Sequence, residues 1–412
     1  MNLVIDCFKL VKGAGKSIGI YNLAKSIVEH LGERMAQRYA AQDGTACADN
    51  IIVFGNAYNR AEFDVAGVTF VEVDGNPLDK WSCIWWELVL VKKYARLYQA
   101  DRVLFPRGYR PIGRNRYIGR RKDGGKIRDV ILIHDLIPFY YDKHYPGAFN
   151  KVENAYIMYR MKASMKKADR IITISEYSRK DILDKAPGCG GKIVVIHNGL
   201  NDVGDAAAGA GGKEPTGRQE GKAVRPGGEG GSAAGQPGAR GYIAAMTSGL
   251  PHKNAKGVLR AYEIYFHTVK EPLDLAVFGI ADVSIWPGMD KEAAAHVRCY
   301  KFFEKFEDMC RMAAGARAYL FLSYVEGFGF PPLEAMQLGV PVVCSNRSSL
   351  PEVVLDAALL VDPDDYAGAA KALAQVTTQG ELREELIRRG YQNIRRFSWE
   401  SRTALYWREL FR

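Results

Sequence analysis

The sequence predicts an α/β protein with two Rossmann-like, doubly wound domains. Short β-branched runs alternate with segments of helical periodicity along the whole chain, which is typical of parallel sheets covered by helices. Twelve strand-like runs are too many for one compact unit of this kind. A Gly/Ala-rich stretch without aromatic residues, 203–241, interrupts the pattern near its middle. The length of 412 residues, with 47% hydrophobic and 25% charged residues, fits an ordinary folded protein.

The strands are predicted from short apolar runs, and helices are expected between them. These runs are 3–7, 51–54, 68–73, 103–105, 130–134, 171–175, 193–196, 242–246, 273–278, 319–323, 342–344 and 359–361. A clear helix is expected up to about Ala168, because apolar residues recur there at helical spacing from Val152 onward. We expect a first domain over 1–188 and a second over 189–397, with 203–241 as a disordered insertion in the second.

Charge and cysteine content narrow the class of protein. The net charge of +10 favours anionic partners, such as phosphorylated small molecules, nucleic acid or acidic membranes. The seven cysteines are scattered and contain no C-x-x-C pair, which argues against a zinc site or a disulfide framework and favours a reducing cytoplasm. The apolar run at the N-terminus is too short for a signal peptide, and no run of 18 apolar residues follows. Membrane contact is therefore expected to be peripheral.

A glycine turn follows the first predicted strand. Gly13 and Gly15 precede a helix that is expected to begin near Ile18. A nucleotide-binding P-loop is excluded because Leu10 stands where that motif needs its first glycine. Amides at a helix start attract phosphate, so the turn is a candidate phosphate contact, while an ordinary strand-to-helix turn remains an equal alternative.

A lysine stands at the corresponding point of the second half. The segment 247–254 follows a predicted strand, and Asn254 is expected to cap a helix over 255–268. Lys253 would then lie beside the positive end of that helix and could bind a diphosphate. The alternative is a solvated surface lysine.

Two acids, Glu326 and Glu334, are separated by a glycine-rich and aromatic segment. Glu326 is expected on the loop after the strand 319–323, and Glu334 in the first turn of the next helix. Gly327 and Gly329 prevent one continuous helix, so both carboxylates could accept hydrogen bonds from the vicinal hydroxyls of a ribose and a hexose. The alternative is a glutamate that stabilises its helix dipole and an unrelated surface glutamate.

The spelling E-G-F-G-F-P-P-L-E of this segment resembles the donor signature of the retaining glycosyltransferases of the GT-B fold, family 4. The resemblance implies that Glu326 contacts the donor sugar and that Glu334 holds the nucleotide ribose. It also implies that Lys253 binds the donor diphosphate, while Ser248 replaces an arginine common in the family. With the glycine turn, the predicted donor-binding set is Gly13, Gly15, Ser248, Lys253, Glu326, Gly327, Phe328, Gly329, Phe330 and Glu334.

The resemblance also suggests an acceptor side. His134 and Asp135 end a predicted strand and are similar to the family's N-domain histidine motif, which implies a catalytic set of His134, Lys253 and Glu326 and an acceptor contact at Asp135. A buried structural histidine is the alternative for His134. The family further implies that the two domains face each other across a cleft, with the donor held by the C-terminal domain and the acceptor by the N-terminal domain. It also implies that a final helix over 398–412 returns to the N-terminal domain.

Two further charged segments can be interpreted either as ordinary structural features or as functional sites. The stretch 107–128 contains nine basic residues and one acid, Asp123; it is either a solvated loop or a site for an anionic, lipid-linked acceptor at a membrane surface. Asp362 and Asp364 form a D-x-D sequence, but the segment is expected to end a strand and to cap a helix that begins near Tyr366. No metal ligand is assigned there.

The predicted activity is retaining, metal-independent transfer of a hexose from a nucleoside diphosphate sugar to an acceptor hydroxyl. The sugar is of mannose, glucose or rhamnose type, and the product belongs to a surface polysaccharide or glycolipid. We expect no cofactor and no nucleic-acid partner, a glycan or lipid-linked acceptor, and a cytoplasmic protein with the inner membrane face as a hypothetical contact. The alternatives are a non-catalytic binding protein for sugar nucleotides or polyanions and, among enzymes, an epimerase or a phosphorylase.

Overall fold

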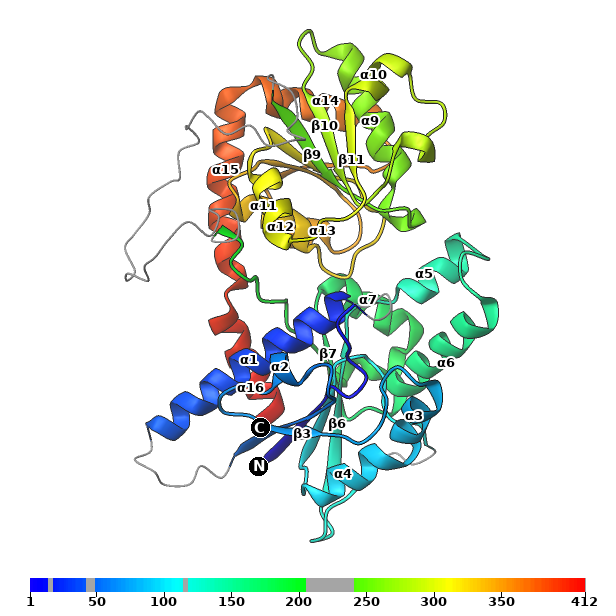
Figure 1. Cartoon of the computed structure of the whole chain (residues 1–412), viewed down its shortest axis with the longest axis vertical. Coiled ribbons are helices and arrows are strands. Elements are labelled where there is room, and N and C mark those ends of the chain that lie inside the picture. The colour runs from blue at the N-terminus through cyan, green and yellow to red at the C-terminus, as the bar shows by residue number, and fades with distance from the viewer. Residues whose placement is uncertain (14–17, 42–48, 114–117, 205–240, 412) are drawn as a thin grey trace. The chain divides into compact units, whose positions relative to one another are not determined.

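The computed structural model describes residues 1–13, 18–41, 49–113, 118–204 and 241–411 (Figure 1). The chain forms two compact units. The first contains Met1–Leu200, Glu326–Phe328 and Phe397–Arg412, and the second contains Asn201–Val325 and Gly329–Arg396. The first unit thus extends to Leu200, compared with an expected boundary at 188. Most of the expected insertion, residues 205–240, lies outside the described residues.

The first unit is built on a sheet in the order β3-β2-β1-β4-β6-β7-β8, whose neighbouring strands are parallel, while β5 pairs antiparallel with β6. Val4 of β1 lies between Ile52 and Val103 in register. The strands are β1 (Asn2–Asp6), β2 (Asn50–Gly55), β3 (Thr69–Glu72), β4 (Arg102–Phe105), β5 (Gly119–Arg120), β6 (Lys126–Ile133), β7 (Arg170–Thr173) and β8 (Ile193–Val195).

Helices cover this sheet on both faces. Val4 packs in one cluster with Trp86 and Val91, while its neighbours Leu3 and Ile5, which point to the opposite face, are equally buried. The helices are α1 (Ile18–Ala40), α2 (Arg60–Phe63), α3 (Lys80–Trp85), the π-helix η1 (Trp86–Leu90), α4 (Val91–Leu97), α5 (Ile137–His144), α6 (Lys151–Lys167), α7 (Glu176–Lys185), the 3-10 helix η2 (Pro187–Lys192) and α16 (Trp399–Phe411). The last helix, α16, packs along α1 (Figure 1).

The second unit has a fully parallel sheet in the order β11-β10-β9-β12-β13-β14. Its strands are β9 (Tyr242–Met246), β10 (Asp274–Phe278), β11 (Val297–Tyr300), β12 (Ala318–Phe321), β13 (Val342–Ser345) and β14 (Ala358–Val361). All twelve predicted runs are strands, and the prediction missed the short strands β5 and β11.

The helices of the second unit bury apolar faces against this sheet, with α9 and α14 packed together in one core cluster (Figure 1). They are the 3-10 helix η3 (Pro251–Lys253), α9 (Ala255–Thr268), the 3-10 helix η4 (Val283–Ile285), α10 (Lys291–Ala295), α11 (Phe306–Ala314), α12 (Phe330–Gln337), α13 (Leu350–Val354), α14 (Tyr366–Thr378) and α15 (Gly380–Ile394). The 3-10 helix η5 (Arg395–Phe397) follows α15. The two-domain α/β prediction is confirmed in both sheets.

Both sheets reverse their strand order at the first strand of the unit. In the first unit β1 lies between β2 and β4, and in the second β9 lies between β10 and β12. In such sheets the loops after the two strands at this switch point diverge and leave a crevice at their carboxyl ends, where ligands bind. The strand order therefore gives each unit one expected site, after β1 and β4 in the first and after β9 and β12 in the second.

None of the described helices has both the length and the apolar composition needed to span a bilayer. None of the six cysteines within the described residues forms a disulfide, and Cys47 lies outside them.

Candidate functional site

The loop after β9 holds Lys253 at the switch point of the second unit. Thr247 Oγ1 donates a hydrogen bond to the carbonyl oxygen of Lys253 at 2.7 Å, and the Lys253 amide donates to Leu250 O at 2.9 Å. Ser248 belongs to the same turn, because its hydroxyl oxygen accepts from the Leu250 amide at 3.3 Å. The half-buried Lys253 side chain places its ammonium 5.9 Å from the centre of the Phe321 ring in β12. The loop thus fixes one cation beside the neighbouring strand.

Asn254 connects this loop to the start of α9. Its backbone is left-handed, with φ 54°, and its side-chain oxygen accepts from the Gly257 amide at 3.1 Å, so the predicted N-cap and the predicted helix are both confirmed. Its side-chain nitrogen donates to Leu322 O at 3.1 Å and to Pro363 O at 3.0 Å. One buried side chain therefore ties the positive end of α9 to the segments that follow β12 and β14.

Glu334 lies in α12, which begins after Gly329 and ends at Gln337. Gly329 and Gly339, which flank the helix, adopt φ values of 118° and 72° that a residue with a side chain rarely adopts. Glu334 is the fifth residue of α12, so its predicted place in the first turn was wrong: the helix already begins at Phe330, before the two prolines. Burial raises the pKa of the Glu334 carboxyl to about 7. Near neutral pH this group can either donate or accept a hydrogen bond, which suits a pair of vicinal hydroxyls.

The three residues Glu326–Phe328 pack with the first unit, although the chain on both sides of them belongs to the second. Glu326 is buried, with 9% of its surface exposed. A Cβ atom at Gly327 would lie 2.7 Å from His134 O and 3.1 Å from Asp135 Cβ, so this close approach requires glycine. The structure thus brings the loop of the acidic motif to the predicted histidine motif, although His134 precedes Gly327 by 193 residues in the chain.

His134 is held by the loop after β4. Its Nε2 atom lies 2.8 Å from Pro106 O, and because a carbonyl oxygen only accepts, Nε2 carries the proton. Burial lowers the pKa of His134, against the opposing effects of the Pro106 bond and Asp135. The ring is therefore neutral near pH 7, with its lone pair on Nδ1. Asp135 Oδ1 accepts from the Ile137 amide at 3.0 Å and so closes the turn into α5.

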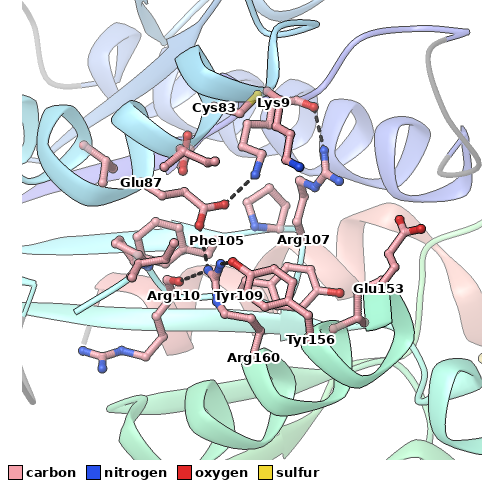
Figure 2. Close-up of a pocket in the computed structure, with 18 of the residues that line it drawn as sticks. Lys9, Cys83, Glu87, Phe105, Arg107, Tyr109, Arg110, Glu153, Tyr156 and Arg160 are labelled. Carbon is pink, nitrogen blue, oxygen red and sulfur yellow. Dashed lines mark hydrogen bonds and ion pairs between the residues drawn. The ribbon is translucent and has the colours of Figure 1, made fainter. Parts of the chain in front are cut away.

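A cavity of about 1080 Å³ opens at the switch point of the first unit (Figure 2). Its lining includes Asp6 and Lys9, which end and follow β1, and Phe105, Arg107 and Tyr109, which end and follow β4. The segments α3 to α4 and the start of α6 complete its walls. No motif in the sequence indicates this cavity.

An ion-pair network crosses this cavity, as Figure 2 shows. Glu87 binds Lys9 Nζ at 2.5 Å and Arg160 Nη2 at 2.7 Å. Burial would raise the pKa of the Glu87 carboxyl, but the two cations outweigh it and lower the pKa. Arg160 also donates to the Tyr156 hydroxyl at 2.9 Å and lies 5.7 Å from the Tyr109 ring centre. Fixed charges next to aromatic faces are groups that can hold sugar hydroxyls and the apolar face of a sugar ring.

Asp6 is a second acid of this cavity. Its two oxygens accept from the Trp86 indole nitrogen at 3.1 and 3.2 Å, and burial raises the pKa of the carboxyl to about 6 despite this bond. Arg107 donates to Lys9 O at 2.8 Å and so joins the loops after β4 and β1. The cavity wall is therefore cross-linked by hydrogen bonds rather than formed by independent side chains.

Parts of the glycine turn and of the basic stretch 107–128 lie outside the described residues, and the rest can be compared with the predictions. Gly13 has a φ of 76° and faces open space, while Gly15 lies outside the described residues. The stretch 107–128 is not one uniform cationic surface, because three of its basic residues are paired with acids, and 114–117 lie outside the described residues. These pairs are Arg110 with Asp129, Arg121 with Asp101 and Asp123, and Lys126 with Asp169.

The acids of the D-x-D segment form a helix cap and ion pairs within the protein, and the segment follows strand β14 as predicted. Asp365 caps α14 by accepting from the Gly368 amide at 2.8 Å. Asp362 and Asp364 each lie 2.7 Å from the same nitrogen of Arg347.

The cavity residues escaped the sequence analysis because they come from four separate segments. Lys9, Glu87, Tyr109 and Arg160 show no common spacing. A doubly wound sheet was predicted, but only the observed strand order shows that the loops after β1 and β4 are the expected ligand sites.

Two family models match the chain. The model described as Glycosyltransferase Family 4 matches residues 35–202, and the model described as Glycosyl transferases group 1 matches residues 234–393. The O-antigen chain mannosyltransferase B of Escherichia coli is 37% identical over 168 residues, which is 40% of this chain and 44% of that protein. The O-antigen chain mannosyltransferase RfbU of Salmonella typhimurium is 26% identical over 251 residues, 60% of each chain. The chain thus spans about half the length of these curated relatives.

Solved structures of the same fold cover nearly the whole chain. A sucrose-phosphate synthase from Thermosynechococcus elongatus superimposes with a TM-score of 0.63 at 16% identity, covering 100% of this chain and 99% of its own. WaaG, a glycosyltransferase involved in lipopolysaccharide biosynthesis, gives 0.60 at 11% identity, covering 100% and 99%. The two family models together span well over half of the sequence, and the chain belongs to the group 1 glycosyltransferases of the GT-B fold.

Proposed function

We propose that this protein transfers a sugar from a nucleoside diphosphate sugar to an acceptor hydroxyl, with retention at the anomeric carbon, in the synthesis of a polysaccharide. The observation that carries the proposal is the set of hydrogen bonds formed by the Asn254 side chain. This residue fixes the positive end of α9 and the cation of Lys253 at the switch point of the second sheet, in a chain that belongs to this family. Amides and one ammonium at such a position match the diphosphate of an activated sugar.

The proposed chemistry follows from where charge develops. When the glycosidic bond to the donor breaks, negative charge grows on the diphosphate, and Lys253 with the α9 amides would stabilise it without a metal ion or cofactor. Glu334, with its pKa near neutrality, would bind the ribose hydroxyls, and Glu326 would bind the donor sugar. Neither acid is proposed as a covalent nucleophile.

Mannose is the sugar that we propose. The two relatives described above are named as mannosyltransferases of O-antigen chains, and the serotype-specific mannosyltransferase WbdA of Escherichia coli is a third, 22% identical over 286 residues. The corresponding product is a cell-surface polysaccharide.

The cavity of the first unit is the proposed acceptor site. Its fixed ion pairs around Glu87 and the rings of Tyr109 and Tyr156 offer the hydrogen bonds and flat apolar surfaces that a glycan needs. His134 supports the cavity wall through its bond to Pro106 and is proposed to position the loop next to the reacting sugar.

A donor screen tests the proposal. The purified chain is melted with GDP-, UDP-, ADP- and TDP-sugars, and release of nucleoside diphosphate is then followed without acceptor and with mannose-containing oligosaccharides. We expect GDP-mannose to raise Tm most and to turn over, with faster release when an acceptor is present. No thermal shift with any donor would contradict the proposal.

A second function, a non-catalytic binder of sugar nucleotides, is favoured by one observation. Ser248 takes the place of an expected arginine and is engaged in its own turn at Leu250. Binding of a donor without any release of nucleoside diphosphate, with or without acceptor, would support this alternative.

A further inference from the structure

An apolar face is exposed along α3 and η1. Trp81 is 75% exposed, Trp85 55% and Leu88 41%, and the three follow one another at helical spacing. The opposite side of the same helical segment carries Trp86 and Val91, which are completely buried in the core of the first unit. Two exposed tryptophans and a leucine on one side of a well-anchored helix form a contiguous patch, and patches of this kind mark interaction sites.

A cationic cavity lies beside α4, the helix that directly follows η1. It has a volume of about 720 Å³ and is formed by α4 and the segment around β5. All of the charged residues in its described lining are basic: Lys92, Lys93, Arg96, Arg120 and Lys122. The Arg96 guanidinium donates to the Arg120 carbonyl at 3.2 Å, which holds the two walls together without neutralising either charge.

These charges are not cancelled by nearby acids in the described part of the chain. Lys93 and Lys122 form none of its ion pairs, and the Lys92 ammonium donates only to the carbonyl oxygens of Leu88 and Ile112, at 3.1 and 2.8 Å. The cavity is therefore a concentrated positive site. It contrasts with the cavity of the first unit's switch point, where Lys9 and Arg160 each form an ion pair with Glu87.

The apolar patch adjoins the cationic cavity, because Lys92 of the cavity follows Leu88 of the patch by one helical turn and its ammonium donates to the Leu88 carbonyl oxygen at 3.1 Å. Indole rings favour the boundary between headgroups and acyl chains, and clustered Lys and Arg attract anionic headgroups. We propose that this surface docks on an anionic lipid bilayer. Trp81, Trp85 and Leu88 enter the headgroup boundary, and the cavity between α4 and β5 receives a lipid phosphate.

This assignment differs from the one that the sequence suggested. The whole basic stretch 107–128 was the expected membrane contact, but of its described basic residues only Arg120 and Lys122 line the cationic cavity, and the other charges in the described lining come from α4. A soluble phosphate would account for the cavity but not for the exposed tryptophans. A lipid accounts for both features with one occupant.

Docking would also place the proposed acceptor site at the membrane. Ile84 and Glu87 line the 1080 Å³ cavity from the same helical segment that carries Trp81 and Trp85. This consequence rests on the proposed function. The docking itself does not, and its test requires no donor or transfer activity.

The experiment is co-sedimentation of the full chain with phosphatidylcholine vesicles and with vesicles enriched in phosphatidylglycerol. The wild type should bind the anionic vesicles and not the neutral ones. The double variants Lys93→Glu/Lys122→Glu and Trp81→Ser/Trp85→Ser should each weaken binding by about tenfold or more. Matched controls in the second unit, Lys371→Glu and Phe302→Ser, should bind like the wild type; Phe302 is 75% exposed, as Trp81 is.

Thermal unfolding of each variant verifies folding, and the single variants Lys93→Glu and Trp81→Ser replace any double variant that unfolds early. Equal binding to both kinds of vesicle, or undiminished binding of both double variants, would overturn the proposal. Inorganic phosphate binding without vesicle binding would identify a soluble-anion site instead. A wild-type dimer that the tryptophan variant converts to monomer, again without vesicle binding, would assign the patch to a second copy.

Discussion

The switch points of the two sheets occupy equivalent topological positions but are built from different groups. After β9 the site consists of a short loop, one ammonium at Lys253 and the amides at the start of α9, with Asn254 as the fixing side chain. After β1 and β4 the site is a large cavity whose walls carry Glu87, Arg160 and several aromatic rings. Backbone groups dominate the first of these sites, and side chains dominate the second.

The difference matches the ligands that we propose for them. A diphosphate is the same in every activated sugar, so a helix start and a cation within one continuous segment are sufficient. An acceptor glycan differs in hydroxyl pattern from one polymer to another, and its recognition needs many side chains from separate segments. The comparison therefore predicts that changes after β9 affect donor chemistry and that changes in the cavity affect only the acceptor.

The largest effect is expected at the donor residues. Lys253→Ala removes the cation that would stabilise the leaving diphosphate, and Glu326→Ala removes the proposed contact with the donor sugar. Each should lower kcat/KM for transfer by roughly 10²-fold or more, as measured by nucleoside diphosphate release. Lys270→Ala, an exposed lysine just beyond the other end of α9, is the control and should leave the rate unchanged. Near-normal turnover in the Lys253 and Glu326 variants would break the assignment of the donor site.

A smaller and more selective effect is expected in the cavity. Tyr156→Ala removes an aromatic ring that lines it, and should raise the acceptor KM by about five- to tenfold while donor hydrolysis without acceptor is unchanged. Tyr159 lies on the same helix, is 70% exposed and does not line the cavity, so Tyr159→Ala is the matched control. If both variants behave alike, the acceptor does not occupy this cavity.

Ser248→Arg tests whether a second cation at the donor site improves donor binding. The substitution introduces the arginine that the family resemblance implies at this position, and a second positive charge should lower the donor KM by about three- to tenfold. Steady-state kinetics at fixed acceptor measure it. A higher donor KM would mean that the turn closed by Ser248 and Leu250 matters more than an added charge.

The smallest effect concerns stability and pH. The pKa of Glu334 is raised to about 7 in the folded protein, from 4.5, because of burial. Between these values the folded state holds a proton that the unfolded state has lost, so the contribution of Glu334 to stability falls as pH rises from about 4.5 to 7. Glu334→Gln removes this penalty. Its Tm should exceed that of the wild type by a few degrees at pH 8 and by less at pH 5, in calorimetric scans. A wild-type advantage that grows with pH would contradict the raised pKa.

Local patterns predicted the fold well, because the buried strands are compact apolar runs and several helices begin at a residue whose side chain caps them. Asn254 before α9 and the glycines around α12 are examples in which one residue determines a boundary. The strands β5 and β11 were missed because the first has two residues and the second, V-R-C-Y, mixes polar and apolar side chains at the sheet edge.

The sites were predictable only where they are local. Lys253 and Glu334 lie in motifs with their own spacing, whereas the network of Lys9, Glu87 and Arg160 exists only after the fold brings three distant segments together. The basic stretch 107–128 shows the converse. Its basic residues are neighbours in the sequence but lie in different environments of the folded protein. Arg110 is buried and forms an ion pair with the buried Asp129, whereas Lys122 lines the cationic cavity.

Hydrogen–deuterium exchange with and without GDP-mannose tests most directly whether the two switch points bind different ligands. The donor should protect amides of residues 247–257 and 322–336 and leave residues 105–112 of the first unit's cavity unchanged. A mannose-containing oligosaccharide should do the reverse. Protection by the donor at 105–112, with none at 247–257, would contradict the division between the two sites.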